Sequence, residues 1–400
     1  MKSVRSRLLL VTGLLALWPG CADRAPADPV VYTWHRHLLP GRYPALARTP
    51  TGVALACNDA GRIMLSAGGD LRFEQVPVSA SEYSPVYAAW ALAELQLLVR
   101  TPDVEDKTWS LLSDGASGWT ASTTPANGLL EVASGPGRLL AAGRVGWRRD
   151  DLLFADWGGA SWTTRRLENV GYPVDGMGGY YDPFEYDLAV SAQDELRLVT
   201  FDGCPKSYSE MLLWTESSVG WQQERIHPAI EEGRTRARSK LGLSIAAGRE
   251  IVVAFVLPAE QGDRIRLIRG EKGSWRQEDL LDPILATFKK PTHLSPPSNW
   301  PVTGYQLTSV AMDAVGATYV ATVRRRTESD PYEIVVAHDR TGQWTEEVVP
   351  IEPPAGQPDM PPTSLQMVVD RDRAIHLVYE ELESADSPHR ACYAVGSPRE

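Results

Sequence analysis

The chain has 400 residues, and its 51 Asp and Glu against 40 Lys and Arg give a net charge of −11, which argues against a broad nucleic-acid-binding surface. An apolar content of 43% excludes wholesale disorder, and 30 Pro with 33 Gly suits a protein rich in β-turns. This length allows two or three ordinary domains, or one large domain built from repeats.

The first 20 residues are organised like an export signal. Lys2, Arg5 and Arg7 precede the apolar run Leu8 to Leu17. This run is too short to cross a bilayer as a helix, and no later segment is long and apolar enough to do so. The segment therefore predicts export from the cytoplasm.

The apolar run is followed by Trp18, Pro19, Gly20 and Cys21. The Gly20-Cys21 pair resembles the lipobox of bacterial lipoproteins, although Trp18 and Pro19 depart from its usual residues. The resemblance implies a signal peptide over 1–20, lipidation of Cys21, a tether over 21–29 and an outer-membrane anchor. The alternative is a secreted or periplasmic protein, cleaved after the Ala25-Pro26-Ala27 sequence.

Three further cysteines follow, namely Cys57, Cys204 and Cys392. In an oxidising compartment at most one pair of them can form within the chain. Cys57 and Cys392 lie near the two ends of the expected folded region, so they would meet if those ends lie together. The alternative, which we favour, is that each is a small buried apolar residue.

From residue 30 onward one short pattern recurs: a turn, then an aromatic residue, then alternating polar and apolar residues. Self-similarity at this spacing is typical of stacked β units. We call these aromatic residues the anchors and expect them to pack between units. The seven anchors are Trp34, Phe73, Trp119, Trp162, Trp221, Trp275 and Trp344.

Before an anchor come two short apolar strands around a tight turn, as in 188–199, 309–321 and 366–379, and then a third strand. The anchor strand is the fourth, and no window shows sustained helical periodicity. Four antiparallel strands per unit, repeated in a ring, predict an all-β fold: one β-propeller domain over 30–400. Seven blades fit the seven anchors, with six or eight as the alternatives.

The two ends of the chain complement each other. Trp34 has no strands of its own before it, whereas the last unit, 365–395, has three strands and no anchor after it. This resembles the closure of propellers in which the N-terminal strand completes the last blade. We therefore expect the strand around Trp34 to be the outermost strand of the seventh blade.

The turn from Ser113 to Trp119 resembles a degenerate Asp-box hairpin of sialidase-like propellers, although the other turns lack the Asp. The resemblance implies the propeller architecture and leaves a divergent glycoside hydrolase as an alternative function. Such an enzyme would need two carboxylates roughly 5–10 Å apart on one face.

We name the strands of a blade A to D from the axis outward. The A–B and C–D turns are then short, and the B–C and D–A connections are long. All long loops should therefore lie on one face of the ring, where function usually resides. One of these loops, 172–186, mixes aromatic residues, glycines and carboxylates, which suits sugar, peptide or cation binding. A second loop, 289–305, carries His293, Trp300 and four prolines. Aromatic packing that fills the mouth of the channel is the alternative. The candidate ligand residues are Tyr172, Asp175, Tyr180, Tyr181, Asp182, Phe184, Glu185, His293 and Trp300.

No signature of a nucleophile, a catalytic metal or a phosphate loop is present, so we expect no catalytic residue. His35 and His37 face the same side of one strand without a third ligand, and His376 is expected in the core. We expect no cofactor and leave a structural divalent cation open. The sequence thus favours a non-catalytic binding module for a glycan, peptide or protein.

Overall fold

The computed structural model describes residues 30–68, 70–82, 84–100, 108–115, 118–127, 130–144, 151–168, 170, 185–202, 209–218, 220–230, 242–257, 263–284, 308–324, 330–351, 362–382 and 389–399. These residues form strands and turns, and within them no helix is long and apolar enough to cross a membrane.

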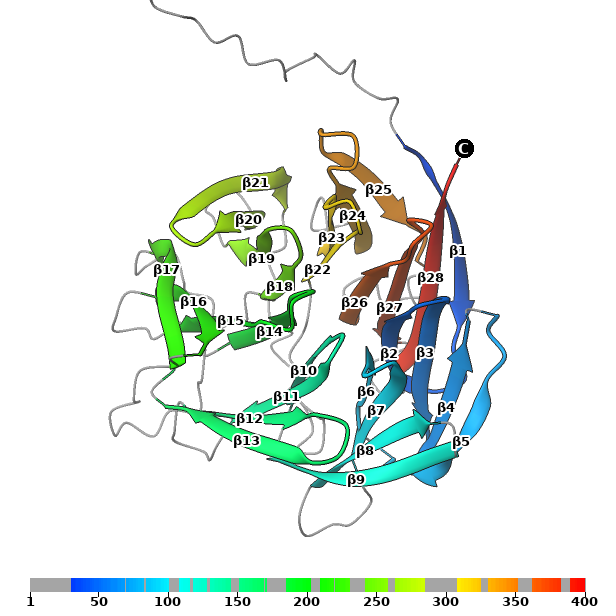
Figure 1. Cartoon of the computed structure of the whole chain (residues 1–400). Coiled ribbons are helices and arrows are strands. Elements are labelled where there is room, and N and C mark those ends of the chain that lie inside the picture. The colour runs from blue at the N-terminus through cyan, green and yellow to red at the C-terminus, as the bar shows by residue number, and fades with distance from the viewer. Residues whose placement is uncertain are drawn as a thin grey trace, which may run out of the picture.

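The strands form seven antiparallel four-stranded sheets, which stand around a common axis as the blades of a propeller (Figure 1). The predicted seven-bladed architecture is confirmed. From the axis outward, blades 1 to 7 comprise β2 (Arg42–Thr49), β3 (Gly52–Asp59), β4 (Arg62–Ala67) and β5 (Glu74–Ser79); β6 (Val86–Ala91), β7 (Glu94–Arg100), β8 (Thr108–Gly115) and β9 (Gly118–Asn127); β10 (Leu130–Gly135), β11 (Arg138–Arg144), β12 (Leu152–Trp157) and β13 (Trp162–Leu167); β14 (Glu185–Val190), β15 (Leu196–Asp202), β16 (Ser209–Ser217) and β17 (Gly220–Ile230); β18 (Ser244–Ala247), β19 (Ile251–Leu257), β20 (Asp263–Glu271) and β21 (Ser274–Ile284); β22 (Thr308–Met312), β23 (Thr318–Arg324), β24 (Glu333–His338) and β25 (Thr345–Val349); and β26 (Thr363–Val369), β27 (Ile375–Leu382), β28 (His389–Pro398) and β1 (Tyr32–Leu38).

The N-terminal strand closes the ring. β1 pairs with β28 along its whole length, from Tyr32 opposite Pro398 to Leu38 opposite Cys392. In Figure 1 the first strand of the chain therefore lies beside the last one. The predicted position of Trp34 on the outermost strand of blade 7 is confirmed.

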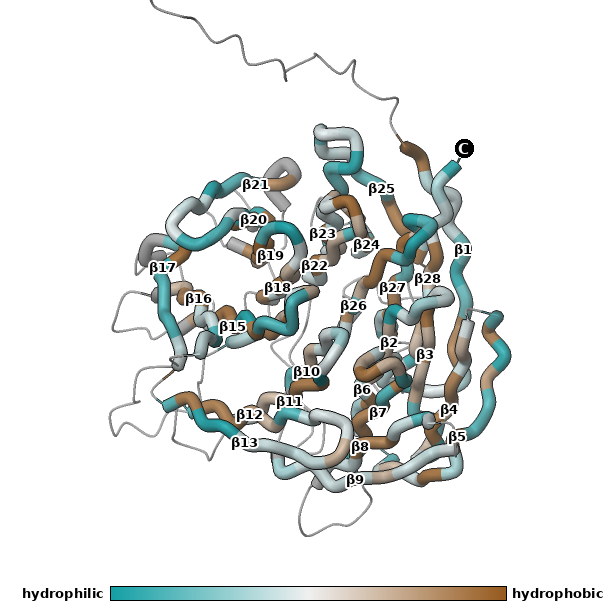
Figure 2. Tube along the Cα trace, viewed as in Figure 1, coloured by the Kyte–Doolittle hydropathy of each residue, from teal (hydrophilic) through white to brown (hydrophobic). Residues whose placement is uncertain are grey.

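The middle strands of each blade are buried on both faces, because every blade packs against two neighbours. The sequence of β19, Ile-Val-Val-Ala-Phe-Val-Leu, is accordingly apolar at successive positions rather than alternating. Outermost strands such as β17 and β21 are largely hydrophilic, as Figure 2 shows. The core is thus a ring of interfaces between blades rather than one central cluster.

The anchors pack at these interfaces, as predicted. Each one joins the hydrophobic cluster between its own blade and the preceding blade, with Trp34 between blades 6 and 7 and Phe73 between blades 7 and 1. Trp119, Trp162, Trp221, Trp275 and Trp344 take the same place at the five interfaces between them. The recurring aromatic residue is therefore part of the packing between blades.

Cys57 and Cys392 are buried and free, so the alternative of a disulfide between them is wrong. They belong to different interfaces, since Cys57 lies in the cluster between blades 7 and 1 and Cys392 in the cluster between blades 6 and 7. Burial raises the pKa of each thiol to about 12. Both residues are small core side chains, as favoured above.

His376 is a core histidine, as predicted. Its Nδ1 lies 2.7 Å from the Tyr393 hydroxyl and its Nε2 lies 3.0 Å from Oδ2 of Asp370, so both ring nitrogens have partners. His35, by contrast, is exposed on β1.

A second buried histidine lies directly beside the closing strand. His338, at the end of β24, is fully buried, and neither of its ring nitrogens has a hydrogen-bond partner within the described residues. Its ring lies 5.4 Å from that of Tyr32 on β1 and 5.7 Å from that of Tyr319 on β23. Burial and the charge of Arg340 lower the pKa of His338 to about 4, against a smaller opposing effect of Asp339.

This arrangement predicts that acid weakens the closure. Between pH 6.5 and pH 4 the unfolded chain binds a proton on His338 while the folded chain does not, so the free energy of unfolding should fall with pH, by about 2–3 kcal/mol from this residue. Denaturant unfolding of wild type and His338→Phe from pH 7 to pH 4 measures it. The difference in stability between the two proteins should shift in favour of the variant as the pH falls. His35→Gln is the exposed control, and a pH-independent difference for His338→Phe would contradict the prediction.

Candidate functional site

The A–B turn of blade 5 is shorter than those of its two neighbours. Between β18 and β19 the turn has three residues, 248–250, whereas the turns of blades 4 and 6 have five, 191–195 and 313–317. The two longer turns are braced by side chains: Ser191 Oγ accepts the backbone N–H groups of residues 193 and 195, and Asp313 Oδ1 accepts those of residues 315 and 317. On the face of the ring that carries the A–B and C–D turns, the short turn of blade 5 therefore lies lower than the two braced turns beside it.

Two pockets open at this step. One lies between blades 4 and 5 and has a volume of about 390 Å³, and the other lies between blades 5 and 6 and has a volume of about 520 Å³. We call them pocket 4/5 and pocket 5/6. Both volumes fall within the range of about 300–1,000 Å³ that is usual for ligand sites. Arg249, Glu250 and Glu271, all from blade 5, line both pockets.

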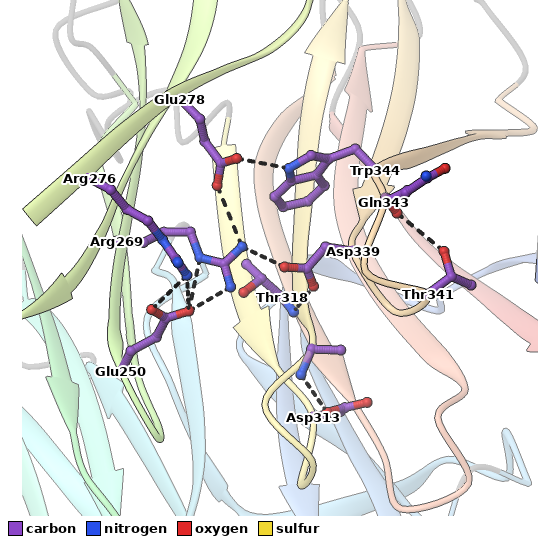
Figure 3. A network of polar contacts seen from close by, with 11 residues as sticks. Glu250, Arg269, Arg276, Glu278, Asp313, Thr318, Asp339, Thr341, Gln343 and Trp344 are labelled. Carbon is purple, nitrogen blue, oxygen red and sulfur yellow. Dashed lines mark hydrogen bonds and ion pairs between the residues drawn. The ribbon is translucent and has the colours of Figure 1, made fainter. Parts of the chain in front are cut away.

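The base of pocket 5/6 is an ion-pair network around Arg269 (Figure 3). The guanidinium donates to Glu250 at 2.5 and 2.9 Å, to Asp339 of blade 6 at 2.5 Å and to Glu278 at 3.5 Å. Arg276 binds the same Glu250 carboxylate from the open side at 3.1 Å. Burial opposes the charge of Arg269, but its bonds to Asp339 and Glu250 outweigh burial and raise its pKa. Arg269 thus links blade 5 to blade 6 through its ion pairs with Glu250 and Asp339.

The network is extended by two contacts that orient its acidic partners. Asp339 Oδ1 accepts the backbone N–H of Thr318 at 2.7 Å, and Glu278 Oε2 accepts the indole N–H of Trp344 at 3.1 Å (Figure 3). The carboxylates are therefore fixed from both sides. A site built on such a base is organised before any ligand arrives.

Two of the anchors, Trp275 and Trp344, each donate a hydrogen bond to a glutamate on the preceding blade. Trp275 Nε1 donates to Glu224 Oε1 at 2.8 Å, as Trp344 does to Glu278. Glu224 and Glu278 each stand three residues after the anchor of their own blade. Glu347, three residues after Trp344, accepts the backbone N–H of Tyr32 on the closing strand at 3.3 Å.

Sequence reasoning found the anchors and missed this partner residue. The signal was present as the repeated spacing Trp-x-x-Glu at Trp221, Trp275 and Trp344. The hydrogen bond between Trp275 and Glu224 also links the two pockets, because Glu224 lines pocket 4/5 and Trp275 lines pocket 5/6.

The outer ends of the pocket walls carry charged side chains that make few or no ion pairs with the described residues. Arg249 and Glu271 are exposed and have no partner within the described residues. The side chain of Arg276 is 66% exposed and touches Glu250 alone among the described carboxylates. Pocket 5/6 also contains Val315, which is 63% exposed at the tip of its turn.

One glycine allows the wall of pocket 5/6 to be this tight. Gly270 has φ of +152°, and a Cβ atom there would lie 2.1 Å from the carbonyl oxygen of Ser274. Any other residue would force the C–D turn of blade 5 apart.

Of the ligand residues predicted from the sequence, the structure describes Glu185 alone. It is the first residue of β14, is 8% exposed and accepts the backbone N–H of Leu243 at 3.4 Å. Tyr172, Asp175, Tyr180, Tyr181, Asp182, Phe184, His293 and Trp300 lie outside the described residues, as do Cys21 and Cys204. The strand bounds confirm that the longest connections, 168–184, 231–243, 285–307 and 350–362, are D–A segments. The expectation fails elsewhere, because the B–C connection of blade 1 and the D–A connection from blade 2 to blade 3 have two residues each, whereas the C–D connections of blades 1 and 6 have six.

A second carboxylate, which the sequence did not single out, stands near Glu185. Asp187 accepts the backbone N–H of Ile245 and that of Leu188, each at 2.8 Å. Burial raises its pKa to about 6, although these bonds and the Ser244 hydroxyl act against burial. Both carboxylates of β14 thus bind backbone groups of blade 5.

Among the described residues no group of three or more His, Cys, Asp or Glu side chains stands close enough to hold a metal ion.

No protein-family model matches the chain, and no curated protein matches it either. Solved structures do match. A chain of the mitotic checkpoint complex is 12% identical, with a TM-score of 0.51 over 98% of this chain and 99% of that chain. The six-bladed fucose-recognising lectin of Aleuria aurantia is 14% identical, with a TM-score of 0.43 over 82% and 98%. An ulvan lyase of polysaccharide lyase family PL25 is 10% identical, with a TM-score of 0.41 over 77% and 78%. The likeness to the first of these, at 12% identity, shows the fold alone.

The Trp-to-Glu contact between blades predicts a difference between two equivalent tryptophans. Trp275→Phe should lose about 1 kcal/mol more stability than Trp221→Phe, because the first loses a hydrogen bond to Glu224. Trp221 packs at the interface between blades 3 and 4, and its indole nitrogen has no hydrogen bond within the described residues. Urea unfolding of both variants measures the difference, and equal losses would show that the hydrogen bond contributes nothing.

Proposed function

We propose that this chain is an exported, lipid-anchored binding module of the bacterial cell envelope, and that the two rim pockets hold a carbohydrate. The observation that carries the proposal is the pair of pockets at blade 5, with a fixed ionic base and unpaired polar tips. The propeller itself supplies a rigid frame for such a site.

The mixture of groups in the pockets favours a neutral polyhydroxyl ligand. Pocket 4/5 combines the amides of Gln222 and Gln223 with Glu271 and Arg249. Side chains of both charges in one pocket give no strong preference for an anion or a cation, but they donate and accept paired hydrogen bonds. Val315 adds an exposed apolar side chain to pocket 5/6, which can contact the C–H groups of a sugar ring.

The long-loop face remains a second predicted binding face. Its aromatic residues, Tyr180 and Tyr181 above all, lie outside the described residues. The pockets stand on the other rim, among the A–B and C–D turns. A ligand at the rim pockets and a ligand at the loops would therefore be independent of each other.

The alternative function is a divergent sialidase-like glycoside hydrolase. The observation in its favour is that Glu185 and Asp187 both lie at the start of β14, beside the long D–A connection, and that the pKa of Asp187 is raised to about 6. A carboxyl with such a pKa can act as a general acid. The bonds of both carboxylates to the blade 5 backbone favour a structural role instead.

The binding proposal is tested on an array of neutral and acidic saccharides. The purified protein should bind neutral saccharides, and Arg249→Ala should weaken this binding about tenfold or more, since a hydrogen-bonded charged side chain contributes about 1.5–3 kcal/mol. Arg371→Ala is the matched control, because Arg371 is exposed on the A–B turn of blade 7 and lines neither pocket. Release of reducing sugar from the same saccharides would favour the hydrolase. Absence of any saccharide binding would refute the proposal.

The anchoring proposal depends on Cys21. Cys21→Ser should abolish incorporation of labelled fatty acid and move the protein from the membrane fraction to the soluble fraction, because the thiol is the site of lipid attachment. Cys204→Ser is the control and should leave both unchanged. Labelled lipid on the Cys21→Ser variant, or a soluble wild-type protein, would contradict the lipoprotein assignment.

A further inference from the structure

We infer that the two rim pockets are consecutive subsites of one site, and that its ligand is an oligosaccharide of at least two sugar units that passes over blade 5. This inference rests on the proposed function and specifies its ligand. It predicts that the length of the saccharide, and not the identity of one sugar alone, determines affinity.

The first reason is that the pockets have a common wall. Arg249 and Glu250 of the A–B turn and Glu271 of the C–D turn line both cavities. All three come from blade 5, whose short A–B turn lowers the rim between blades 4 and 6. A sugar in either pocket therefore lies against the same three residues as a sugar in the other.

The second reason is that one residue of this wall is held by ion pairs while the other two are not. Glu250 is held from below by Arg269 at 2.5 Å and from the side by Arg276 at 3.1 Å, so its carboxylate is fixed. Arg249 and Glu271 are exposed and have no partner within the described residues. A guanidinium has five N–H donors in a planar fork, so Arg249 can donate to hydroxyl groups of two neighbouring sugars at once. The wall is thus a fixed base with two polar tips that a bridging ligand can use.

The third reason is that the pockets differ in their remaining walls. Pocket 5/6 adds Arg276 and the exposed Val315, whereas pocket 4/5 adds Gln222 and Gln223. One sugar unit would present C–H groups to Val315, and its neighbour would present hydroxyl groups to the two glutamines. Two unlike subsites side by side give the site a direction along the saccharide chain.

The pockets are also coupled through the packing between blades. Glu224 of pocket 4/5 accepts the indole N–H of Trp275 of pocket 5/6 at 2.8 Å, and it accepts the backbone N–H of Gly273 at the same distance. The distance between the two subsites is therefore fixed by the fold. A ligand that matches this spacing gains the second contact at high effective concentration.

The experiment is calorimetric titration of the full chain with three homologous series of one to four units: N-acetylglucosamine and its β-1,4 oligomers, the cello-oligosaccharides and the malto-oligosaccharides. In the series that binds, affinity should rise about tenfold or more from the monosaccharide to the longer members, because the second subsite is filled by a linked unit. Arg249→Ala should weaken binding of all members.

Two single-pocket variants separate the subsites. Gln223 lines pocket 4/5 and not pocket 5/6, and Arg276 lines pocket 5/6 and not pocket 4/5. In Arg276→Ala the shared Glu250 keeps its two bonds from Arg269. Gln223→Ala and Arg276→Ala should each reduce the affinity for the tetramer toward that for the monomer, and so flatten the dependence on length. Arg371→Ala should retain the full dependence, and thermal melts of all variants confirm that the ring is folded.

The outcomes distinguish this inference from the function on which it rests. If a monosaccharide binds as tightly as its tetramer, or if Gln223→Ala and Arg276→Ala leave the length dependence intact, the pockets are separate sites and the inference is wrong while the binding function stands. If no member of the three series binds and the array is also empty, the binding function fails and the inference fails with it.

Discussion

The ring depends on the pairing of β1 with β28. This ladder joins residues from the two ends of the chain, and the backbone N–H of Arg399 adds a hydrogen bond to the carbonyl of Val31 at 2.8 Å. The side chains of Tyr32 and Trp34 on β1 pack in the interface between blades 6 and 7. Loss of this pairing would remove Tyr32 and Trp34 from that interface and leave β28 as an unpaired edge.

The chain is not equally reinforced around the ring. In blades 4 to 6 a polar side chain of the innermost strand binds the backbone of the next blade: Asp187 accepts from Ile245, Ser244 from Val310 and Ser309 from Met367. The three Trp-x-x-Glu spacings fall on the same side of the ring, in blades 4 to 6. This half also carries both rim pockets, so the candidate site stands between blades that these contacts join. Rigid neighbours are what a site between two blades requires, because its width is the distance between them.

Most of the fold could be predicted from the sequence, and most of the candidate site could not. The anchors follow a repeated local pattern, and strands such as 309–312 and 318–321 alternate with tight turns, so local rules suffice to find blades and to assign Trp34 to the last one. The pockets arise instead from a difference of two residues between the A–B turn of blade 5 and those of its neighbours, and from Glu224 meeting Trp275 across two blades. Local periodicity carries no information about such contacts, and Glu185, expected in a loop, begins a strand for the same reason.

Two buried groups make opposite demands on pH, and both serve junctions between blades. His338 beside β1 has its pKa lowered to about 4, so its contribution to stability is lost as the pH falls from about 6.5 toward 4. Asp187 between blades 4 and 5 has its pKa raised to about 6, so its ionisation costs stability as the pH rises from about 4 toward 6. Over the shared window, from about pH 4 to pH 6, the two effects oppose each other. Acid therefore destabilises the junction beside the closing strand and stabilises the junction between blades 4 and 5.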